Sequence, residues 1–160
     1  MTDVVRMRLR LKSPDGKVTY PLGDLERELF AKASPLATAV FKAAIADDKY
    51  AGETFHRIIR GFVIQAGEGV DCEPYAADER GLALTFGVGA LAMSNDGDAD
   101  SGNAEFFVTT SRADELDGKY VIIGRVSDKS LTIMRAVEKC GDTDGTVLSD
   151  VIITATQFHT

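Results

Sequence analysis

Apolar and polar residues alternate along several stretches of the chain, a pattern typical of strands with one buried face. Val4–Leu11, VVRMRLRL, alternates apolar with basic residues, and Ser13–Gly16 after it favours a turn. In Glu105–Thr110, EFFVTT, the alternation predicts that Phe106 and Phe107 lie on opposite faces. Further strand-like runs occupy residues 17–20, 55–59, 62–66, 82–86, 90–94, 120–126 and 151–158.

Two other stretches carry apolar residues at helical spacing. The first begins at Ser34–Pro35, where Ser34 can cap the helix and Pro35 suits its first position. The second covers Ser130–Lys139, with Gly141 as its stop. Gly23–Ala31 fits either a strand or a short helix. About seven or eight short strands and two helices predict a mainly β protein, a closed or nearly closed antiparallel barrel with helices over its ends.

The stretch Thr54–Gly69, TFHRIIRGFVIQAGEG, contains two of these runs, joined by Arg60–Gly61, where glycine permits a tight turn. Because side chains alternate between faces, one face is predicted to carry Phe55, Arg57, Ile59, Val63 and Gln65. The opposite face, with His56, Ile58 and Ile64, is expected to enter the core. Arg57 would therefore meet Val63 and Gln65 on an open face.

Composition is that of an ordinary globular protein of 160 residues, 44% hydrophobic and 27% charged, which favours one domain over residues 1–160. The net charge of -7 argues against general affinity for nucleic acid or anionic membranes. No apolar run reaches the length of a membrane span, and Met1–Asp3 does not begin a signal peptide. Cys72 and Cys140 form no CxxC motif, so a reduced, cytoplasmic protein is expected.

Most candidate motifs have a simpler structural explanation. The loop Asp96–Gly102 places acids at positions one, three and five of a calcium loop, but Ser101 and Phe107 stand where that loop needs glycine and glutamate. A solvated acidic turn is the favoured interpretation. Ser94 lacks the GxSxG context of a nucleophile, and His and Cys are too few for a metal site. Neither a metal nor another cofactor is expected.

Arg57 is the strongest candidate for a functional residue. A lone strand arginine usually pairs with a carboxylate or is solvated. Here the neighbouring residues change that expectation, because Phe55, Phe62, Gln65 and Phe107 are predicted to lie close to it. An apolar pocket beside a few aimed donors is the usual form of a small-molecule or peptide site.

FHRIIRGFVIQAGEG closely resembles the signature of the cyclophilins, which are peptidyl-prolyl cis-trans isomerases. Gly89–Asn95, GALAMSN, followed by EFFVTT and by Leu116–Val126, LDGKYVIIGRV, is a second match. Gly23–Phe41 is a weaker one, similar to the family's second strand and first helix, which assigns Gly23–Ala31 to a strand. The resemblance runs from about Gly23 to Phe158 and implies an eight-stranded antiparallel β-barrel capped by two α-helices.

By position, the resemblance makes Arg57 the catalytic arginine. It assigns the walls of a proline pocket to Phe62, Val63, Phe107 and Leu116, and a polar edge that contacts the peptide to Gln65, Ser94 and Asn95. Glu105 and Tyr120 complete the predicted substrate site, although the family usually has Gln and His there. Val63 replaces a usual Met, Glu115 replaces a frequent Trp, and the loop over residues 96–104 is one residue longer than the common form.

The function implied by the resemblance is acceleration of X–Pro rotation in proline-containing peptides or protein clients, with altered efficiency. No bond is broken, so the reaction needs no nucleophile, metal or redox cofactor. The alternative is a non-catalytic module that binds proline-containing segments of a partner, and a calcium-binding module is a third, unrelated reading. Cyclosporin binding is expected to be weak, because Glu115 offers no indole. Alternation places Glu105 on the same face as Phe107, so the resemblance leads us to expect that it pairs with Arg57. The alternatives are that Glu105 points to water, or that it selects clients with a basic residue beside proline.

Overall fold

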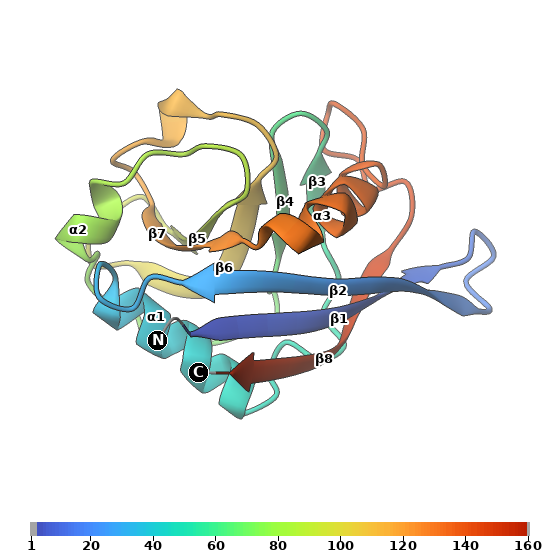
Figure 1. Ribbon diagram of the computed structural model, residues 1–160, viewed down its shortest axis with the longest axis horizontal. Coiled ribbons are helices and arrows are strands. Elements are labelled where there is room, and N and C mark those ends of the chain that lie inside the picture. The colour runs from blue at the N-terminus through green and yellow to red at the C-terminus, as the bar shows by residue number, and fades with distance from the viewer. Residues whose placement is uncertain (1–2, 160) are drawn as a thin grey trace.

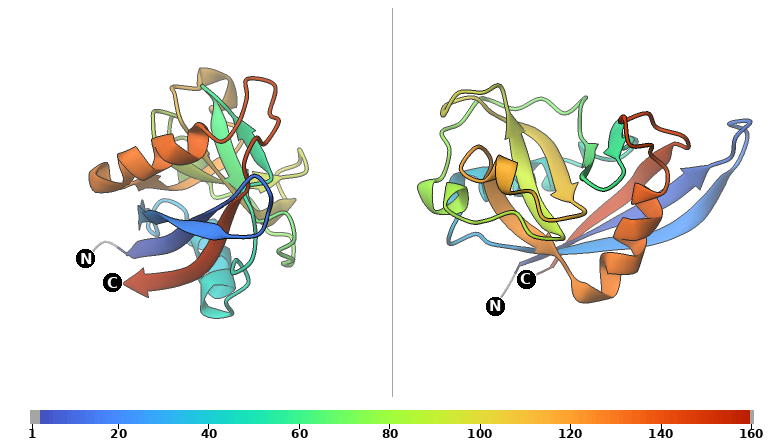
Figure 2. Two further views of the ribbon diagram at one scale, coloured as in Figure 1. Left: turned by 90° about the vertical axis from the view of Figure 1, so that its right-hand side faces the viewer. Right: turned by 90° about the horizontal axis from the view of Figure 1, so that it is seen from above.

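The computed structural model describes residues 3–159 and contains an eight-stranded sheet in the order β3-β4-β6-β5-β7-β2-β1-β8. Every neighbouring pair is antiparallel, and the sheet curls around a central core (Figures 1 and 2). The strands are β1 (Val4–Lys12), β2 (Thr19–Leu29), β3 (Arg57–Ile59), β4 (Val63–Ala66), β5 (Ala90–Asn95), β6 (Gly102–Thr109), β7 (Val121–Val126) and β8 (Val151–His159). The predicted mainly β class with eight antiparallel strands is confirmed.

Two longer helices and one short helix accompany the sheet. The predicted pair is present as α1 (Pro35–Ala46) and α3 (Leu131–Glu138), and α2 (Glu79–Leu82) is an additional single turn. Helix α1 packs against β6 and β8, whereas α3 packs against β2, β3 and β4. Single 3₁₀ turns lie at Asp114–Leu116 and Asp128–Ser130.

The two edge strands of the sheet, β3 and β8, are joined by the irregular segment that precedes β3. Thr54 forms an isolated bridge with Ile152, and the Phe55 N–H donates to the Val151 carbonyl at 3.0 Å. The sheet is therefore a curled half-barrel whose open side is partly closed by backbone outside the regular strands.

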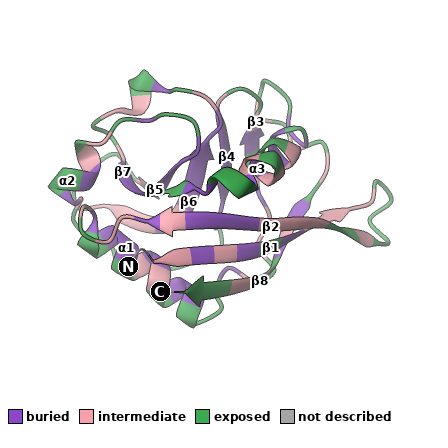
Figure 3. Ribbon diagram, viewed as in Figure 1, coloured by how far each residue is buried: buried purple, intermediate pink, exposed green. Residues whose placement is uncertain are grey.

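Burial follows the predicted alternation in β1, where Val5, Met7 and Leu9 are fully buried between less buried neighbours (Figure 3). Phe106 of β6 lies at the centre of the interior. Its ring centroid is 5.6 Å from that of Phe41 and 5.3 Å from that of Tyr50. Phe107, the next residue, belongs to a second apolar cluster on the other face of β6, with Val63, Phe86, Ala92 and Ile122. This second cluster supports the candidate site.

The pattern fails where the strands are irregular. Most of the two predicted segments 17–20 and Gly23–Ala31 belongs to one strand, β2 (Thr19–Leu29), and the register shifts where Leu9 faces Gly23 and Arg10 faces Pro21. Gly23 has φ +133°, and a Cβ there would lie 2.5 Å from Cδ1 of Ile133. This bulge between β1 and β2 interrupts the alternation of buried and exposed residues along β2. The strand-like run 82–86 is not a strand, because Leu82 ends α2 and residues 83–86 follow it as a loop.

Gly141 was predicted to stop the second helix, but α3 ends at Glu138 and is capped by Lys139 in right-handed conformation. Gly141 lies against β3 instead. A Cβ at this position would be 2.3 Å from the Ile58 carbonyl oxygen. Close approach of two backbones, and not a left-handed cap, is what requires glycine here.

Helix α1 is capped by a residue far along the chain. The predicted cap, Ser34, makes no capping hydrogen bond, and its hydroxyl donates to the Ile122 carbonyl at 2.6 Å. The buried carboxylate of Asp78 takes this role, because its two oxygens accept from the N–H groups of Leu36 at 3.0 Å and Ala37 at 2.9 Å. The prediction was wrong because the acceptor came from a loop beyond the local sequence.

Replacing Asp78 with alanine is expected to lower the free energy of unfolding by about 1–3 kcal/mol, because two N–H groups at a helix start lose a charged acceptor. For a chain of this size, Tm should fall by roughly 2–4 °C per kcal/mol. Urea titration measures the loss. Asp71→Ala, at an exposed position of the same connection, is the control and should change stability by less than about 0.5 kcal/mol. Equal effects of the two substitutions would contradict the capping role.

Candidate functional site

The β3–β4 hairpin places Arg57 on the outer face of the sheet. Arg57 lies opposite Gln65, and Ile58 lies opposite Ile64. Both isoleucines are fully buried in the interior core, so the alternate positions, with Arg57 and Gln65, face outward. The predicted meeting of Arg57, Val63 and Gln65 on one face is confirmed, since all three line one cavity.

Phe55 and His56 do not follow the predicted alternation. Phe55 is fully buried in the interior, with its ring 6.1 Å from that of Phe106 in an edge-on contact. His56 is half-buried, and its Nε2 lies 2.9 Å from Oε1 of Glu105. Regular strand geometry begins only at Arg57, so a period of two could not be extended back to these residues.

The cavity beside Arg57 has a volume of about 140 Å³ and combines eight of the ten predicted site residues. Its lining consists of Arg57, Phe62, Val63, Gln65, Ser94, Phe107, Leu116 and Tyr120. These residues come from strands β3 to β6 and from the segment before β7. The ring of Phe107 is held between Phe86, stacked at 5.7 Å, and Tyr120, edge-on at 5.2 Å. One side of the cavity is therefore a rigid aromatic wall.

The loop that carries Leu116 is hydrogen-bonded to the backbone of Phe86, which belongs to this wall. The Phe86 N–H donates to Oδ1 of Asp117 at 2.8 Å, and Ala113 N–H donates to the Phe86 carbonyl at 3.0 Å. Because Phe86 stacks on Phe107, these bonds also fix the distance between Leu116 and the aromatic wall. Distant segments of the chain thus form a preorganised cavity with an apolar wall and a polar side.

The turn between β3 and β4 is hydrogen-bonded to the last residue of α3 and to the segment that follows this helix. The Gly61 N–H donates to Oε2 of Glu138 at 2.8 Å, and Arg60 donates from Nη2 to the Gly141 carbonyl at 2.8 Å. The Arg60 N–H also donates to the carbonyl of Asp142 at 3.0 Å. Burial raises the pKa of Glu138, but the surrounding donors Thr110, Gly61 and Arg135 together outweigh it and hold this pKa below its usual value. The carboxylate therefore stays charged and anchors the hairpin.

Polar side chains form a ladder beside the cavity. Arg57 donates from Nη1 to Oε1 of Gln65 at 3.1 Å, and Gln65 donates from Nε2 to Oε1 of Glu105 at 2.8 Å. Within residues 3–159, Arg57 and Glu105 form no direct ion pair. The expected direct pairing is wrong, because Gln65 lies between the two charges.

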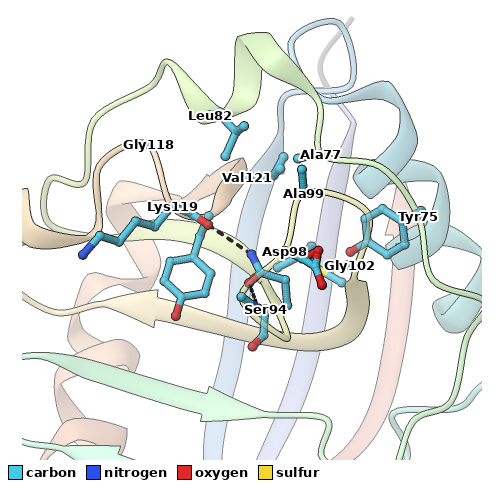
Figure 4. Close-up of a pocket in the computed structure, with 14 residues that line it drawn as sticks. Tyr75, Ala77, Leu82, Ser94, Asp98, Ala99, Gly102, Gly118, Lys119 and Val121 are labelled. Carbon is cyan, nitrogen blue, oxygen red and sulfur yellow. Dashed lines mark hydrogen bonds between the residues drawn. The ribbon is translucent and has the colours of Figure 1, made fainter.

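A larger cavity of about 440 Å³ adjoins the first and shares Ser94 and Tyr120 with it (Figure 4). Asn95 belongs to this second cavity and not to the first. Its Nδ2 donates to the Lys119 carbonyl at 3.0 Å, and its Oδ1 accepts from the Gly97 N–H at 2.9 Å. The amide thus holds together the two loops that border the cavity. The sequence pattern did not predict this cavity, because loops distant in sequence form it.

Comparison with known proteins agrees with this geometry. The family model described as cyclophilin type peptidyl-prolyl cis-trans isomerase/CLD matches residues 16–158. The chain belongs to the cyclophilin family. A crystal structure of a cyclophilin-type peptidyl-prolyl cis-trans isomerase from Cryptosporidium parvum matches with a TM-score of 0.83 and 26% sequence identity. That match covers 100% of this chain and 99% of the Cryptosporidium chain.

Of the four substituted positions, Val63 and Tyr120 contribute to the cavity, whereas Glu105 and Glu115 do not line it. Val63 and Tyr120 line it, and Tyr120 also supports Phe107. Glu115 lies exposed on the 3₁₀ turn next to Leu116, outside the cavity lining. Within residues 3–159, no helix of this cyclophilin is long and apolar enough to span a membrane.

The acidic loop is organised by Ser101, the residue that replaces the glycine of a calcium loop. Ser101 Oγ accepts from the N–H groups of Asp96 at 2.9 Å and Asp98 at 3.2 Å, and it donates to the Asp98 carbonyl at 2.8 Å. Among the described residues, no group of three or more His, Cys, Asp or Glu is arranged to hold a metal ion. The geometry is that of a self-bonded surface loop.

Proposed function

We propose that this cyclophilin accelerates the cis–trans isomerisation of X–Pro peptide bonds in protein clients. The observation that carries the proposal is the position of Arg57 at a small apolar cavity walled by Phe62, Phe107 and Leu116. Membership of an isomerase family supports the same reaction.

The chemistry needs one well-placed cation. Rotation about an amide has a barrier of about 18–20 kcal/mol, and unaided X–Pro isomerisation takes tens to hundreds of seconds. At the twisted transition state, the proline nitrogen is pyramidal and its lone pair is localised. A donor aimed at that nitrogen stabilises the twisted amide more than the planar one. The guanidinium of Arg57 suits this role, being always charged and rigidly forked.

The other residues hold the substrate in our proposal. Phe62, Val63, Phe107 and Leu116 enclose the proline ring, and Ser94 and Tyr120 border the passage to the second cavity. Gln65 restrains Arg57 through the bond to its Nη1. Asn95, whose amide is engaged by two loops, shapes the edge of the groove and does not bind the peptide with a free amide.

Exchange spectroscopy on an Ala-Pro peptide tests this function directly. Catalytic amounts of the protein are expected to broaden and exchange the cis and trans signals, which otherwise interconvert over tens of seconds or more. Binding of the peptide without faster exchange would reject the isomerase and identify a non-catalytic proline-binding module. Absence of both binding and exchange would reject the two functions together.

Cyclosporin binding is expected to be weak, because Glu115 presents an exposed carboxylate where an indole would supply a ring and an N–H donor. Glu115→Trp should strengthen binding by about 1–2 kcal/mol, which is roughly tenfold. Calorimetry measures the affinity, with Glu115→Gln as the control that removes the charge without adding a ring. Nanomolar binding by the wild-type protein would contradict this expectation.

A further inference from the structure

The side-chain ladder Arg57–Gln65–Glu105–His56 crosses strands β3, β4 and β6 beside the cavity. Gln65 is its centre and is 8% exposed, so its amide has little access to water. Gln65 lies opposite Phe107, and Glu105 lies two residues earlier on β6. Glu105 is therefore a diagonal neighbour of Gln65 on the same face of the sheet.

The chemistry of its two partners determines how the Gln65 amide is oriented. An amide has one end that accepts and one end that donates hydrogen bonds, whereas a guanidinium only donates and a carboxylate only accepts. Gln65 Oε1 faces Arg57, and its Nε2 faces Glu105. The reversed amide would place NH₂ against the guanidinium and a carbonyl against the carboxylate. Both contacts would then be repulsive, so Glu105 excludes the reversed orientation.

His56 fixes the carboxylate from the other side. Its Nε2 lies 2.9 Å from the same Oε1 of Glu105 that accepts from Gln65. His56 Nδ1 is buried and has no hydrogen-bond partner among residues 3–159. Gln65 on β4 and His56 just before β3 thus both contact the same carboxylate oxygen of Glu105.

We propose that Glu105 is a positioning residue, which locks the Gln65 amide in one orientation and thereby aims the guanidinium of Arg57 at the cavity. The proposal rests on the isomerase function proposed above. An amide at position 105 can donate as well as accept, so it would satisfy either orientation of Gln65. Glu105→Gln therefore weakens the lock, since only Arg57 still opposes the reversed amide, while size and polarity are preserved.

Kinetics of Glu105→Gln separate positioning from direct charge pairing. Positioning predicts that kcat for an Ala-Pro peptide falls about tenfold, the size expected for one charged hydrogen bond, while KM changes less than about twofold. If Glu105 instead drew the field of Arg57 away from the substrate, the same substitution would raise kcat/KM. Glu73→Gln, an exposed acid outside the site, is the matched control for net charge and should leave the kinetics unchanged.

A double-mutant cycle with Gln65→Ala tests whether Glu105 acts through Gln65. In the Gln65→Ala background, Glu105→Gln should change kcat/KM by less than about twofold, because the lock has already been removed. An undiminished effect in that background, or one seen only with peptides carrying Lys next to Ala-Pro, would overturn the proposal in favour of direct substrate contact.

Side-chain NMR provides a readout that does not depend on activity. In the wild-type protein, the two Gln65 amide protons should give separate, slowly exchanging signals, and the Arg57 Nη1 proton that is donated to Gln65 should be protected from exchange. Glu105→Gln should abolish this protection and Glu73→Gln should preserve it. Unchanged Gln65 and Arg57 signals in Glu105→Gln would overturn the positioning role. Protected signals in a protein without isomerase activity would reject the proposed function alone.

Discussion

Replacing Arg57 with alanine should lower kcat/KM for an Ala-Pro peptide by about 10²–10³-fold, the usual cost of removing one preorganised electrostatic donor. The fold should survive, because Arg57 is exposed and its truncation opens no space in the core. The exchange assay measures the rate, and circular dichroism checks the fold. Arg57→Lys should recover only part of the loss, since an ammonium keeps the charge but not the planar fork that bonds Gln65.

Arg8→Ala is the matched control for this experiment. Arg8 lies on β1, forms a surface pair with Asp24 at 3.5 Å, and does not line the Arg57 cavity. Its removal should leave catalysis unchanged. Full activity of Arg57→Ala with an intact circular dichroism spectrum would reject the assignment of Arg57, whereas equal losses in the two variants would point to a non-specific charge effect.

The second prediction with a large expected effect concerns the stability of the protein and the charge of Arg27 inside its core. Arg27 of β2 is fully buried, with its guanidinium carbon 5.0 Å from the ring centre of Phe106 and 5.5 Å from that of Phe41. None of its three side-chain nitrogens has a hydrogen-bond partner among residues 3–159. Burial lowers the pKa of Arg27 to about 9. The aromatic faces attract the cation but do not replace the water that it has lost.

Arg27→Met should therefore raise the free energy of unfolding by about 1–4 kcal/mol, since a flexible apolar side chain fills the space without a desolvated charge. Thermal and urea unfolding measure the gain. Arg125→Met, which removes an exposed partner of Glu28, is the control and should change stability by less than about 1 kcal/mol. A large loss of stability in Arg27→Met alone would contradict the picture of an uncompensated charge.

The pH dependence of this gain has a definite sign. Burial lowers the pKa of Arg27 to about 9 in the folded protein, whereas in the unfolded chain this pKa has its much higher ordinary value. The unfolded state then binds more protons above pH 9, so wild-type stability gains with rising pH from this group. The advantage of Arg27→Met should be constant below about pH 8 and should shrink above pH 9. Comparing the two proteins cancels the titration of all other groups to first order.

Sequence alternation predicted the structure well wherever a strand is regular. It separated Phe106 from Phe107, and it brought Arg57, Val63 and Gln65 to one cavity. Leu116 and Tyr120 were assigned only through family resemblance, because they reach the cavity from a loop whose position no local pattern determines.

The failures have one physical origin, which is dependence on neighbours distant in the chain. Asp78 caps α1 although it lies 42 residues after Leu36, whose N–H donates to it. Phe55 departs from the strand period because it turns inward to Phe106. Glu105 contacts Gln65 and His56 because of the register between β4 and β6, which only the folded sheet establishes.

The fastening of the β3–β4 hairpin also governs how a client can approach. Strand β3 is an edge strand, and such an edge commonly recruits a peptide as an additional strand. Here the free side of β3 is occupied at its Ile59 end, since Ile59 bridges Asp142 in parallel fashion and the N–H of the next residue, Arg60, is bonded to the Asp142 carbonyl. In the proposed function, a client would therefore gain little affinity from β-augmentation at this edge. The side-chain cavities beside Arg57 would carry more of its recognition, which favours brief encounters with many different unfolded segments over lasting capture of one.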